Sequence, residues 1–376
     1  MTTRGLAYPA GPLHRVRWGA REEACLVTVE SDDGVVGTSI ARSHHGLSHT
    51  SIADGVRHVL APLIIGRRLD DPGDVKTLWS AMMHLHLAQY VPVFAVSALD
   101  TALWDLLGRA AGRPVAALLC DKPAGTVPVY ASLPHFDGVA DALRSAEATL
   151  AAGFSALKVH STGRHDHDIE VCRKLRAELP AGTPLMFDAT RRLDRPAAER
   201  LAALLTELRF AWFEEPFEPF DVDSHRWLAG RCGIPVAAFE TAPGGPDAAR
   251  WAMEQRLAEL LLIDCYWKAG LTGALAVADD AARLGQRLIM HHGASATMNA
   301  ANIQLVAARP ELGHVELLVP YGQYDVGVVL PELVPGAGLR VPAEPGIGFR
   351  LDDEFLDSHT VAGSVRATDA PAGVVP

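Results

Sequence analysis

Cysteine and long apolar runs are both scarce in this chain. Its 376 residues include five cysteines, an odd number that stand far apart with no C-x-x-C pair. We therefore expect neither a disulfide framework nor a zinc site, and a reducing, cytoplasmic location fits this usage. No apolar run approaches the roughly 18 residues of a membrane helix, and no apolar stretch follows Arg4, so neither a membrane span nor a signal peptide is expected.

Positive charge is also in deficit. The chain has 34 Lys and Arg against 45 Asp and Glu, which gives a formal net charge of −11. This balance argues against nucleic acid and anionic membranes as partners. It still permits an anionic small molecule, because a bound cation inverts the local field. The hydrophobic fraction of 49% is large enough for a folded core.

The first 125 residues predict an α+β domain. Apolar and polar residues alternate over 24–30, and a turn rich in Asp and Gly at 31–34 precedes a second apolar strand over 35–41. This pattern is typical of a β-hairpin. Helical spacing of apolar residues follows over 52–65, 78–89 and 94–111. Strands followed by helices favour a separate small domain at residues 1–125.

From residue 126 to 320 the pattern becomes a regular alternation of strand and helix. Short apolar runs occur at 127–132, 156–159, 185–187, 210–213, 236–239, 260–263, 288–290 and 315–319. Eight strands with helices between them predict a β/α barrel of the TIM type. A doubly wound open sheet is the rival, but no G-x-G-x-x-G follows any of these strands. Residues 321–376 are rich in Pro and Gly, and we expect extended segments that pack back on the first domain to complete a cap.

A polar, ionisable residue lies in or directly after seven of these strands. The intervals between them are 30, 26, 26, 24, 27 and 25 residues, about one β/α unit each; the residues are Lys158, Asp188, Glu214, Glu240, Asp264, His291 and Glu316. Consecutive strand ends form a ring at one mouth of a barrel, which is where barrel enzymes place their chemistry. The spacing therefore predicts that these side chains share one pocket.

Three neighbouring carboxylates in that ring predict a metal site. Asp188, Glu214 and Glu240 would repel one another unless a cation lay between them. Hard oxygen ligands without sulfur favour Mg²⁺ or Mn²⁺ over zinc. Glu214 is preferred to Glu215, because 26 residues then separate it from both neighbours and strand alternation turns Glu215 away.

Proton carriers flank the expected metal. Lys158 and His160 form an i, i+2 pair on one strand, and Asp264 and His291 end two successive strands. An Asp beside a His orients the ring and stabilises its charged form. This layout suits removal of a proton α to a carboxylate, with Lys158 and the metal stabilising the enediolate. Glu316, if protonated, could donate a hydrogen bond to the second enediolate oxygen.

Several motifs make the chain resemble the enolase superfamily, specifically its mandelate racemase and acid-sugar dehydratase branch. Residues 97–109 (S-A-L-D-T-A-L-W-D-L-L-G-R), followed by G-R-P at 112–114, resemble the helix that closes that family's capping domain. W-F-E-E-P at 212–216 resembles its fourth barrel strand, and P-G-I-G at 345–348 its return to the cap. The order and spacing of these motifs extend the resemblance over nearly the whole chain.

The resemblance implies a modified TIM barrel with an α+β cap, and a role for each residue of the ring. Asp188, Glu214 and Glu240 match the three Mg²⁺ ligands, Asp264 and His291 the family's Asp–His dyad, and Glu316 the glutamate of the eighth strand. Lys158 matches an electrostatic stabiliser. The family also suggests a homo-oligomer, from a dimer to an octamer.

This sequence departs from the family pattern at a few positions. His160 stands where the family usually has the second lysine of Lys-x-Lys, and Thr190 where an Asn commonly follows the first metal ligand. His291 is followed by His292, and we prefer His291 because of its distance of 27 residues from Asp264.

Substrate contacts are expected from two loops of the cap. His44 and His45 follow the second strand of the hairpin, and Arg17 precedes its first strand, where it could pair with a distal carboxylate. The expected activity is Mg²⁺-dependent dehydration of a hydroxylated carboxylate, such as an aldonate or aldarate. The alternatives are a racemase or epimerase that uses His160 and His291 on two faces, and a metal-binding scaffold without catalysis.

Overall fold

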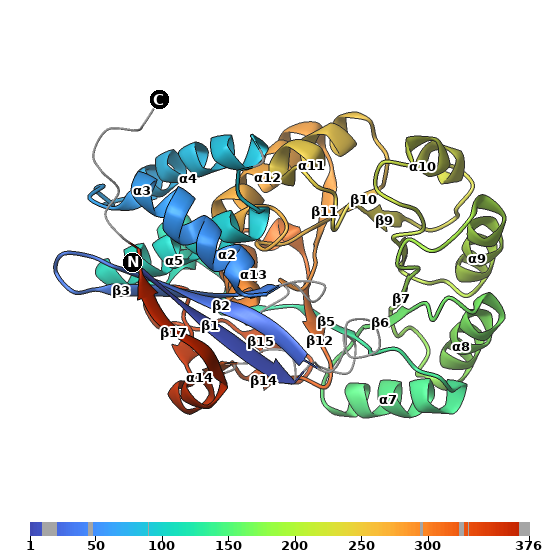
Figure 1. Ribbon diagram of the computed structural model, residues 1–376. Coiled ribbons are helices and arrows are strands. Elements are labelled where there is room, and N and C mark those ends of the chain that lie inside the picture. The colour runs from blue at the N-terminus through green and yellow to red at the C-terminus, as the bar shows by residue number, and fades with distance from the viewer. Residues whose placement is uncertain are drawn as a thin grey trace.

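The chain forms a closed barrel of parallel strands beside a smaller antiparallel sheet with its own helices (Figure 1). The computed structural model describes residues 1–9, 21–43, 48–88, 90–293, 296–322, 327–329 and 331–367. Figure 1 shows the antiparallel sheet and helices α2 to α5 on one side of the barrel, and helices α7 to α10 on the other. The predicted barrel with an α+β cap is confirmed.

The barrel strands lie in the order β10-β11-β12-β5-β6-β7-β8-β9, so each is paired with its neighbour in sequence and β12 closes on β5. They are β5 (Val129–Ser132), β6 (Leu157–His160), β7 (Leu185–Asp188), β8 (Trp212–Glu214), β9 (Val236–Ala238), β10 (Leu260–Ile263), β11 (Arg287–Met290) and β12 (Val315–Leu318). All eight overlap the apolar runs from which they were predicted. Buried on both faces, they read as continuous apolar segments.

Helices cover the outside of the barrel between consecutive strands. Within the described residues they are α7 (Val139–Ala151), α8 (His165–Glu178), α9 (Arg195–Glu207), α10 (Val222–Leu228), α11 (Gly245–Glu254), α12 (Gly270–Leu284) and α13 (Ala296–Ala308). Their Ala- and Leu-rich faces pack on the strands; in α9, Leu201 and Leu205 are buried while Glu199 is exposed. This amphipathic pattern is what fixes each helix against the sheet.

The cap sheet has the order β17-β1-β2-β3, with the hairpin of β2 (Arg21–Glu30) and β3 (Val36–Ser43) at one edge. Strand β1 (Thr2–Pro9) pairs antiparallel with β2 and was not predicted from the sequence. Arg4 and Gly5 interrupt its apolar pattern, which hid the strand. Helix α5 (Val93–Ala110) packs on β3, and most of its residues are buried between the cap sheet and the barrel.

The other cap helices begin earlier than their apolar spacing indicates. Helix α4 runs over Pro72–Leu87, because the Asp71 side chain accepts from the main-chain N–H groups of Gly73 and Asp74 in a capping box. Pro72 and Gly73 look like helix breakers, but proline is well tolerated in the first turn. The predicted helix over 52–65 consists of α2 (Thr50–Asp54), the π-helical turn η2 (Gly55–Leu60) and α3 (Ala61–Ile64). Helix α6 (Val115–Leu119) follows α5.

The chain after the barrel returns to the cap. Its strands and its helix are short: β13 (Val328–Val329), β14 (Leu333–Val334), β15 (Gly338–Arg340), β16 (Arg350–Leu351), α14 (Asp353–His359) and β17 (Thr360–Arg366). β15 pairs with β4 (Thr126–Val127) ahead of the barrel, and β17 pairs with β1. Helix α14, capped by Asp352, was not expected among the extended segments of this tail.

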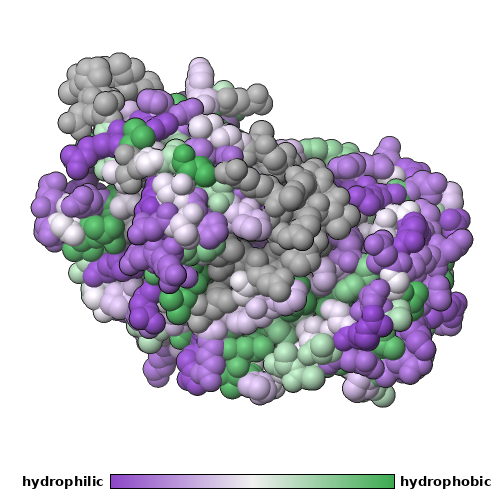
Figure 2. Space-filling view, turned by 60° about the horizontal axis from the view of Figure 1, so that its bottom comes forward, coloured by the Kyte–Doolittle hydropathy of each residue, from purple (hydrophilic) through white to green (hydrophobic). Residues whose placement is uncertain are grey.

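Hydrophilic side chains cover most of the described surface in the view of Figure 2, with hydrophobic ones in small groups. Among the helices that the structure describes, none has both the length and the apolar character needed to cross a bilayer.

Cap and barrel are joined by a buried polar network between α5 and α12. The Trp104 indole N–H donates to Thr272 Oγ1 at 2.8 Å, and that hydroxyl donates to Asp100 Oδ1 at 2.6 Å. Thr272 N also donates to Asp100 Oδ2 at 3.0 Å. Burial raises the pKa of Asp100 to about 7, although the hydrogen bonds from Thr272 and Leu271 oppose this shift.

The Thr272→Val substitution should lower the free energy of unfolding by about 1–3 kcal/mol. It keeps the shape of the side chain but leaves the Trp104 N–H buried without an acceptor, and an unsatisfied buried donor costs about this much. Urea denaturation monitored by tryptophan fluorescence measures the change. Thr272→Ser keeps the hydroxyl and serves as the control. Equal stability of the valine variant and the wild type would contradict the network.

The Asp100→Asn substitution should change how stability depends on pH. Folded Asp100 keeps its proton up to about pH 7, whereas the ordinary value is 3.8. Between these values the folded state binds more protons, so wild-type stability falls as pH rises through this window. The amide that replaces the carboxyl group in this variant does not titrate. Relative to the variant, the wild type should therefore lose stability from about pH 4 to 7 and change no further above pH 7. Urea titrations at several pH values give the free energy of unfolding of both proteins. The same pH dependence in the variant and the wild type would refute this prediction.

Candidate active site

The barrel interior aligns the predicted ring of polar residues. Its floor is apolar and consists of Tyr130, Ala156, Met186, Trp212, Ala237, Leu260, Leu262 and Ile289. Side chains alternate along a strand, so the residue two positions further on points to the same side. Five of these floor residues are followed, two positions later, by an ionisable one: Lys158, Asp188, Glu214, Asp264 and His291. Glu316 lies opposite Tyr130 in the β12–β5 register. The first five are therefore on the side of the carboxyl-terminal mouth, and Glu316 joins them through its Oε1, which lies 2.9 Å from Lys158 Nζ.

Glu240 reaches the mouth by a different route. It lies three residues after the interior Ala237, an odd step that would place it outside the barrel. Phe239 has a left-handed backbone, with φ of 75°, and its side chain packs on His225 outside the barrel. This residue shifts the alternation by one position, so the Glu240 carboxylate turns inward and its Oε1 lies 3.2 Å from His291 Nε2.

Lys158 is the buried cation of the site. Its Nζ lies 2.5 Å from Glu214 Oε1 and 2.9 Å from Glu316 Oε1, and its side chain is only 1% exposed. Burial opposes the ammonium, but Glu214 and Glu316 outweigh it and hold the pKa of Lys158 well above its usual range. The Tyr130 hydroxyl donates to Glu316 Oε2 at 3.0 Å, and the Trp212 indole N–H donates to Glu214 Oε2 at 2.7 Å.

Glu316 is ionised in this arrangement. Burial raises its pKa, but Lys158 and His291 outweigh burial and hold the pKa of this carboxyl well below its usual range. The structure thus does not favour the protonated form, the one in which Glu316 could donate a hydrogen bond to the enediolate. The carboxylate instead accepts the main-chain N–H of His292 at 3.1 Å.

His160 stands beside Asp188 with one ring nitrogen fixed by the main chain. Its Nδ1 lies 2.8 Å from the carbonyl oxygen of Leu133, which can only accept, so Nδ1 carries a hydrogen. Its Nε2 lies 3.4 Å from Asp188 Oδ2 and 3.5 Å from Ser132 Oγ. Nε2 is therefore the nitrogen that can exchange a proton at the mouth.

Asp264 and His291 form a hydrogen-bonded pair. His291 Nδ1 lies 2.7 Å from Asp264 Oδ2, and the other carboxylate oxygen accepts the main-chain N–H groups of Tyr266 and Trp267. The structure thus selects His291 rather than His292 as the partner of Asp264. Burial lowers the pKa of the His291 imidazolium, but Glu240, Glu316 and Asp264 outweigh it and raise the pKa to about 10.

The mouth holds more negative charge than its own cations neutralise. Burial raises the pKa of Asp188 to about 6; Lys158 opposes the shift, and Glu240 adds to it. Burial also raises the pKa of Glu214 to about 8, with Asp188 and Glu316 adding to the shift against the effect of Lys158. A divalent cation among these groups would relieve the repulsion.

The donor set suits such a cation, although the side chains as placed do not enclose one. Asp188, Glu214 and Glu240 offer carboxylate oxygens, the ligands that Mg²⁺ prefers. Among the described residues, no group of three or more His, Cys, Asp or Glu side chains is arranged to hold a metal ion. The oxygens are instead paired with Lys158, Trp212, His160 and His291. The chemistry of the residues fits a metal site, and their ligand roles remain predictions.

Two further buried residues contact the turn that carries Glu240. Lys268, in the loop after β10, is fully buried, and its Nζ donates to the carbonyl oxygens of Phe239 and Glu240. Glu215 was expected to face away from the mouth. Its backbone is left-handed, with φ of 43°, and its Oε1 accepts the Glu240 N–H at 3.0 Å. The only sequence signal for these two contacts was that Glu215 and Lys268 are ionisable residues close in the chain to Glu214 and Asp264.

Asn302 was also missed. Located on α13, it accepts the main-chain N–H of Cys265 at 2.9 Å and donates to the carbonyl oxygen of His291 at 2.9 Å. It thereby ties together the two strand ends that carry Asp264 and His291. Its position in an apolar helix gave no sequence signal for this role.

The three residues predicted to contact substrate from the cap, Arg17, His44 and His45, lie outside the described residues.

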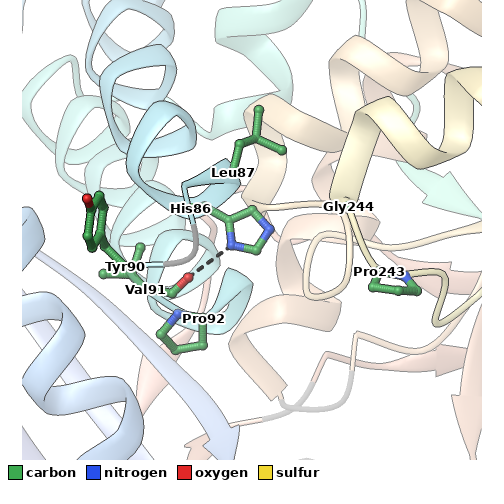
Figure 3. Close-up of a pocket in the computed structure, with 7 residues that line it drawn as sticks. All are labelled: His86, Leu87, Tyr90, Val91, Pro92, Pro243 and Gly244. Atoms are coloured by element: carbon green, nitrogen blue, oxygen red, sulfur yellow. Dashed lines mark hydrogen bonds between the residues drawn. The ribbon is translucent and has the colours of Figure 1, made fainter.

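One pocket of the described residues lies away from the ring of polar residues. This pocket of about 410 Å³ is between the turn that joins α4 to α5 and the loop after β9 (Figure 3). It is lined by His86, Leu87, Tyr90, Val91, Pro92, Pro243 and Gly244. His86 Nδ1 donates to the Val91 carbonyl oxygen at 3.0 Å. None of the predicted catalytic or metal-binding residues lines this pocket.

Comparison with known families agrees with this architecture. Residues 141–355 match the family described as "Enolase C-terminal domain-like", and residues 7–120 match the N-terminal domain family of mandelate racemase and muconate lactonizing enzyme. The chain therefore belongs to the enolase superfamily, in the group of mandelate racemase-like proteins and acid-sugar dehydratases.

Relatives in this group are enzymes of more than one kind. The chain is 28% identical to the L-rhamnonate dehydratase of Saccharopolyspora erythraea, over 92% of this chain and 88% of the relative. It is 24% identical to the arabinonate dehydratase of Saccharolobus solfataricus, over 90% of each. A crystal structure of a racemase from Streptomyces coelicolor with bound magnesium superimposes with a TM-score of 0.82 at 26% identity, covering 96% of this chain and 99% of that one.

Proposed function

We propose that this protein is a Mg²⁺-dependent dehydratase of a hydroxylated carboxylate, of the aldonate or aldarate class. The observation that carries the proposal is the Asp264–His291 pair beside Lys158 at a mouth rich in carboxylates. The two acid-sugar dehydratases to which the chain is similar over about nine tenths of its length support this substrate class.

Asp188, Glu214 and Glu240 would hold the metal, at the ends of three neighbouring strands. When bound, Mg²⁺ supplies a Lewis acid that draws electron density from the substrate carboxylate and makes its α-proton more acidic. The magnesium in the Streptomyces coelicolor racemase supports this choice of cation.

His160 is the proposed base. Its Nδ1 hydrogen is donated to the Leu133 carbonyl oxygen, so in the neutral form of the ring the lone pair is on Nε2. Nε2 takes the α-proton of the substrate, and the electron pair of that C–H bond passes into the enediolate. The Lys158 ammonium, fixed by Glu214 and Glu316, stabilises the charge as it develops.

His291 is the proposed acid. Its raised pKa, about 10, keeps it as an imidazolium at neutral pH. As the enediolate collapses to an enol, the β C–O bond breaks, and the proton of His291 converts the departing hydroxide to water. The enol then tautomerises to a 2-keto-3-deoxy acid. Asp264 holds the ring in position and stabilises its charge throughout.

The His291→Asn substitution should lower dehydration by roughly 10²- to 10⁴-fold, the usual contribution of a positioned acid or base. Incubation with a panel of acid sugars, with and without chelator, and assay of the keto product measure the effect. His84→Asn makes the same change at an exposed position of cap helix α4 and should leave the rate unchanged. An undiminished rate in His291→Asn would refute the assignment. If no acid sugar of the panel yields a keto product, the non-catalytic scaffold becomes the better interpretation.

A racemase or epimerase is the second candidate. His160 on β6 and His291 after β11 offer two proton carriers from separate strands. Inversion of one carbon requires two such groups, one on each face. The similarity to the Streptomyces coelicolor racemase favours it.

Reaction in D₂O separates the two activities. A dehydratase should give a keto acid with deuterium incorporated at C3, and recovered substrate with little deuterium at its α-carbon. A racemase should exchange the α-hydrogen of recovered substrate and form the inverted isomer without a keto acid. NMR and mass spectrometry of the recovered acids show which occurs, and exchange without keto acid would overturn dehydration.

A further inference from the structure

Lys268 and Glu215 are two buried, ionisable residues next to Glu240 to which the function proposed above gives no role. Both contact the same short turn, formed by Phe239 and Glu240 at the end of β9. Lys268 is 0% exposed and Glu215 is 3% exposed. Burial of charged side chains is costly unless they are specifically bonded, so their placement against this turn requires an explanation.

Lys268 reaches the turn from the loop after β10. Its Nζ donates to the carbonyl oxygen of Phe239 at 3.0 Å and to that of Glu240 at 2.7 Å. Phe239 has the left-handed backbone that turns the Glu240 carboxylate inward. A non-glycine residue in this conformation is strained and persists only where its surroundings hold it. The ammonium provides that hold from one side.

Glu215 reaches the turn from the end of β8 and contacts its other side. Its Oε1 accepts the main-chain N–H of Glu240 at 3.0 Å. The N–H and the C=O of Glu240 are therefore both taken by buried side chains, from two different strand ends. Only the Glu240 carboxylate remains directed at the mouth, where it lies 3.2 Å from His291.

We infer that Lys268 and Glu215 are positioning residues that clamp the Phe239–Glu240 turn and so set the affinity of the site for its divalent cation. This inference rests on the proposed function, because it takes Glu240 as a metal ligand. Neither residue would touch the metal or the substrate. Without the clamp the turn relaxes toward ordinary strand alternation, which points the carboxylate out of the mouth.

The test measures metal affinity directly. Metal-stripped protein is titrated with Mn²⁺, and free Mn²⁺ is followed by its EPR signal, which needs no substrate. Lys268→Met removes both hydrogen bonds while keeping an unbranched side chain of similar length. Glu215→Met removes the acceptor, whereas Glu215→Gln keeps an acceptor oxygen. Loss of a group that orients a metal ligand weakens binding by roughly 10- to 100-fold; we expect this for both methionine variants and near wild-type affinity for Glu215→Gln.

Gln304→Met is the matched control. The Gln304 amide is also fully buried and bonds to main-chain groups, donating to the carbonyl oxygens of Pro342 and Ile347 and accepting from Ala116 N. Its partners lie in the tail and after cap helix α5, far in the chain from the Glu240 turn. Thermal unfolding of every variant shows how much stability each has lost. Gln304→Met should lose stability but keep its affinity for Mn²⁺.

The outcomes separate the clamp from the proposed function. Tight Mn²⁺ binding by the wild type, with 10-fold or greater weakening in Lys268→Met and Glu215→Met only, supports the clamp. Affinities of these two variants within about twofold of the wild type, or equal weakening in Gln304→Met, overturn it while the metal site stands. A wild type that binds no Mn²⁺ removes the proposed metal chemistry and the clamp together. If Lys268→Met does not fold, the two Glu215 variants decide the question.

Discussion

Burial of like charges at the barrel mouth is the constraint on which the site depends. Carboxylates from several strands face one another there, and each is held by a donor from a different strand: Lys158 lies between Glu214 and Glu316, and His291 between Glu240 and Asp264. Because no strand supplies both members of such a pair, the order of strands in the barrel fixes which charges meet. Burial, together with repulsion from neighbouring carboxylates, raises the pKa values of Asp188 and Glu214, and a cation at the mouth would offset both effects.

The main chain bears part of the cost of this arrangement. Glu215 and Phe239, which directly follow β8 and β9, and Thr190 and Arg191, shortly after β7, are non-glycine residues with left-handed backbones. Such conformations are costly, and hydrogen bonds between successive loops offset them, as where Arg191 N donates to the Glu215 carbonyl oxygen at 2.7 Å. Part of the backbone strain therefore lies where strands deliver side chains to the mouth. The strands below it remain regular.

The barrel and the ring of polar residues could be predicted because both follow one period along the chain. The β/α repeat gives the strands, and strand alternation gives the side of each residue, which is why Asp264 and His291 could be paired across 27 positions. Contacts without a period could not be predicted. The contacts of Lys268 and Glu215 with the Glu240 turn involve the left-handed backbones of Phe239 and Glu215, and no pattern in the sequence marks those conformations. The ionisation of Glu316 depends on distances to Lys158 and His291 that only the folded chain provides.

Pairing of β1 with β17 joins two segments from opposite ends of the described chain in one sheet. During synthesis β1 emerges first, yet one of its edges lacks a partner until β17 has left the ribosome, after the whole barrel. The hairpin of β2 and β3 covers the other edge early. An open strand edge readily pairs with other chains. Completion of the cap is thus a late event in folding, and the interval before it is when this protein is most exposed to aggregation.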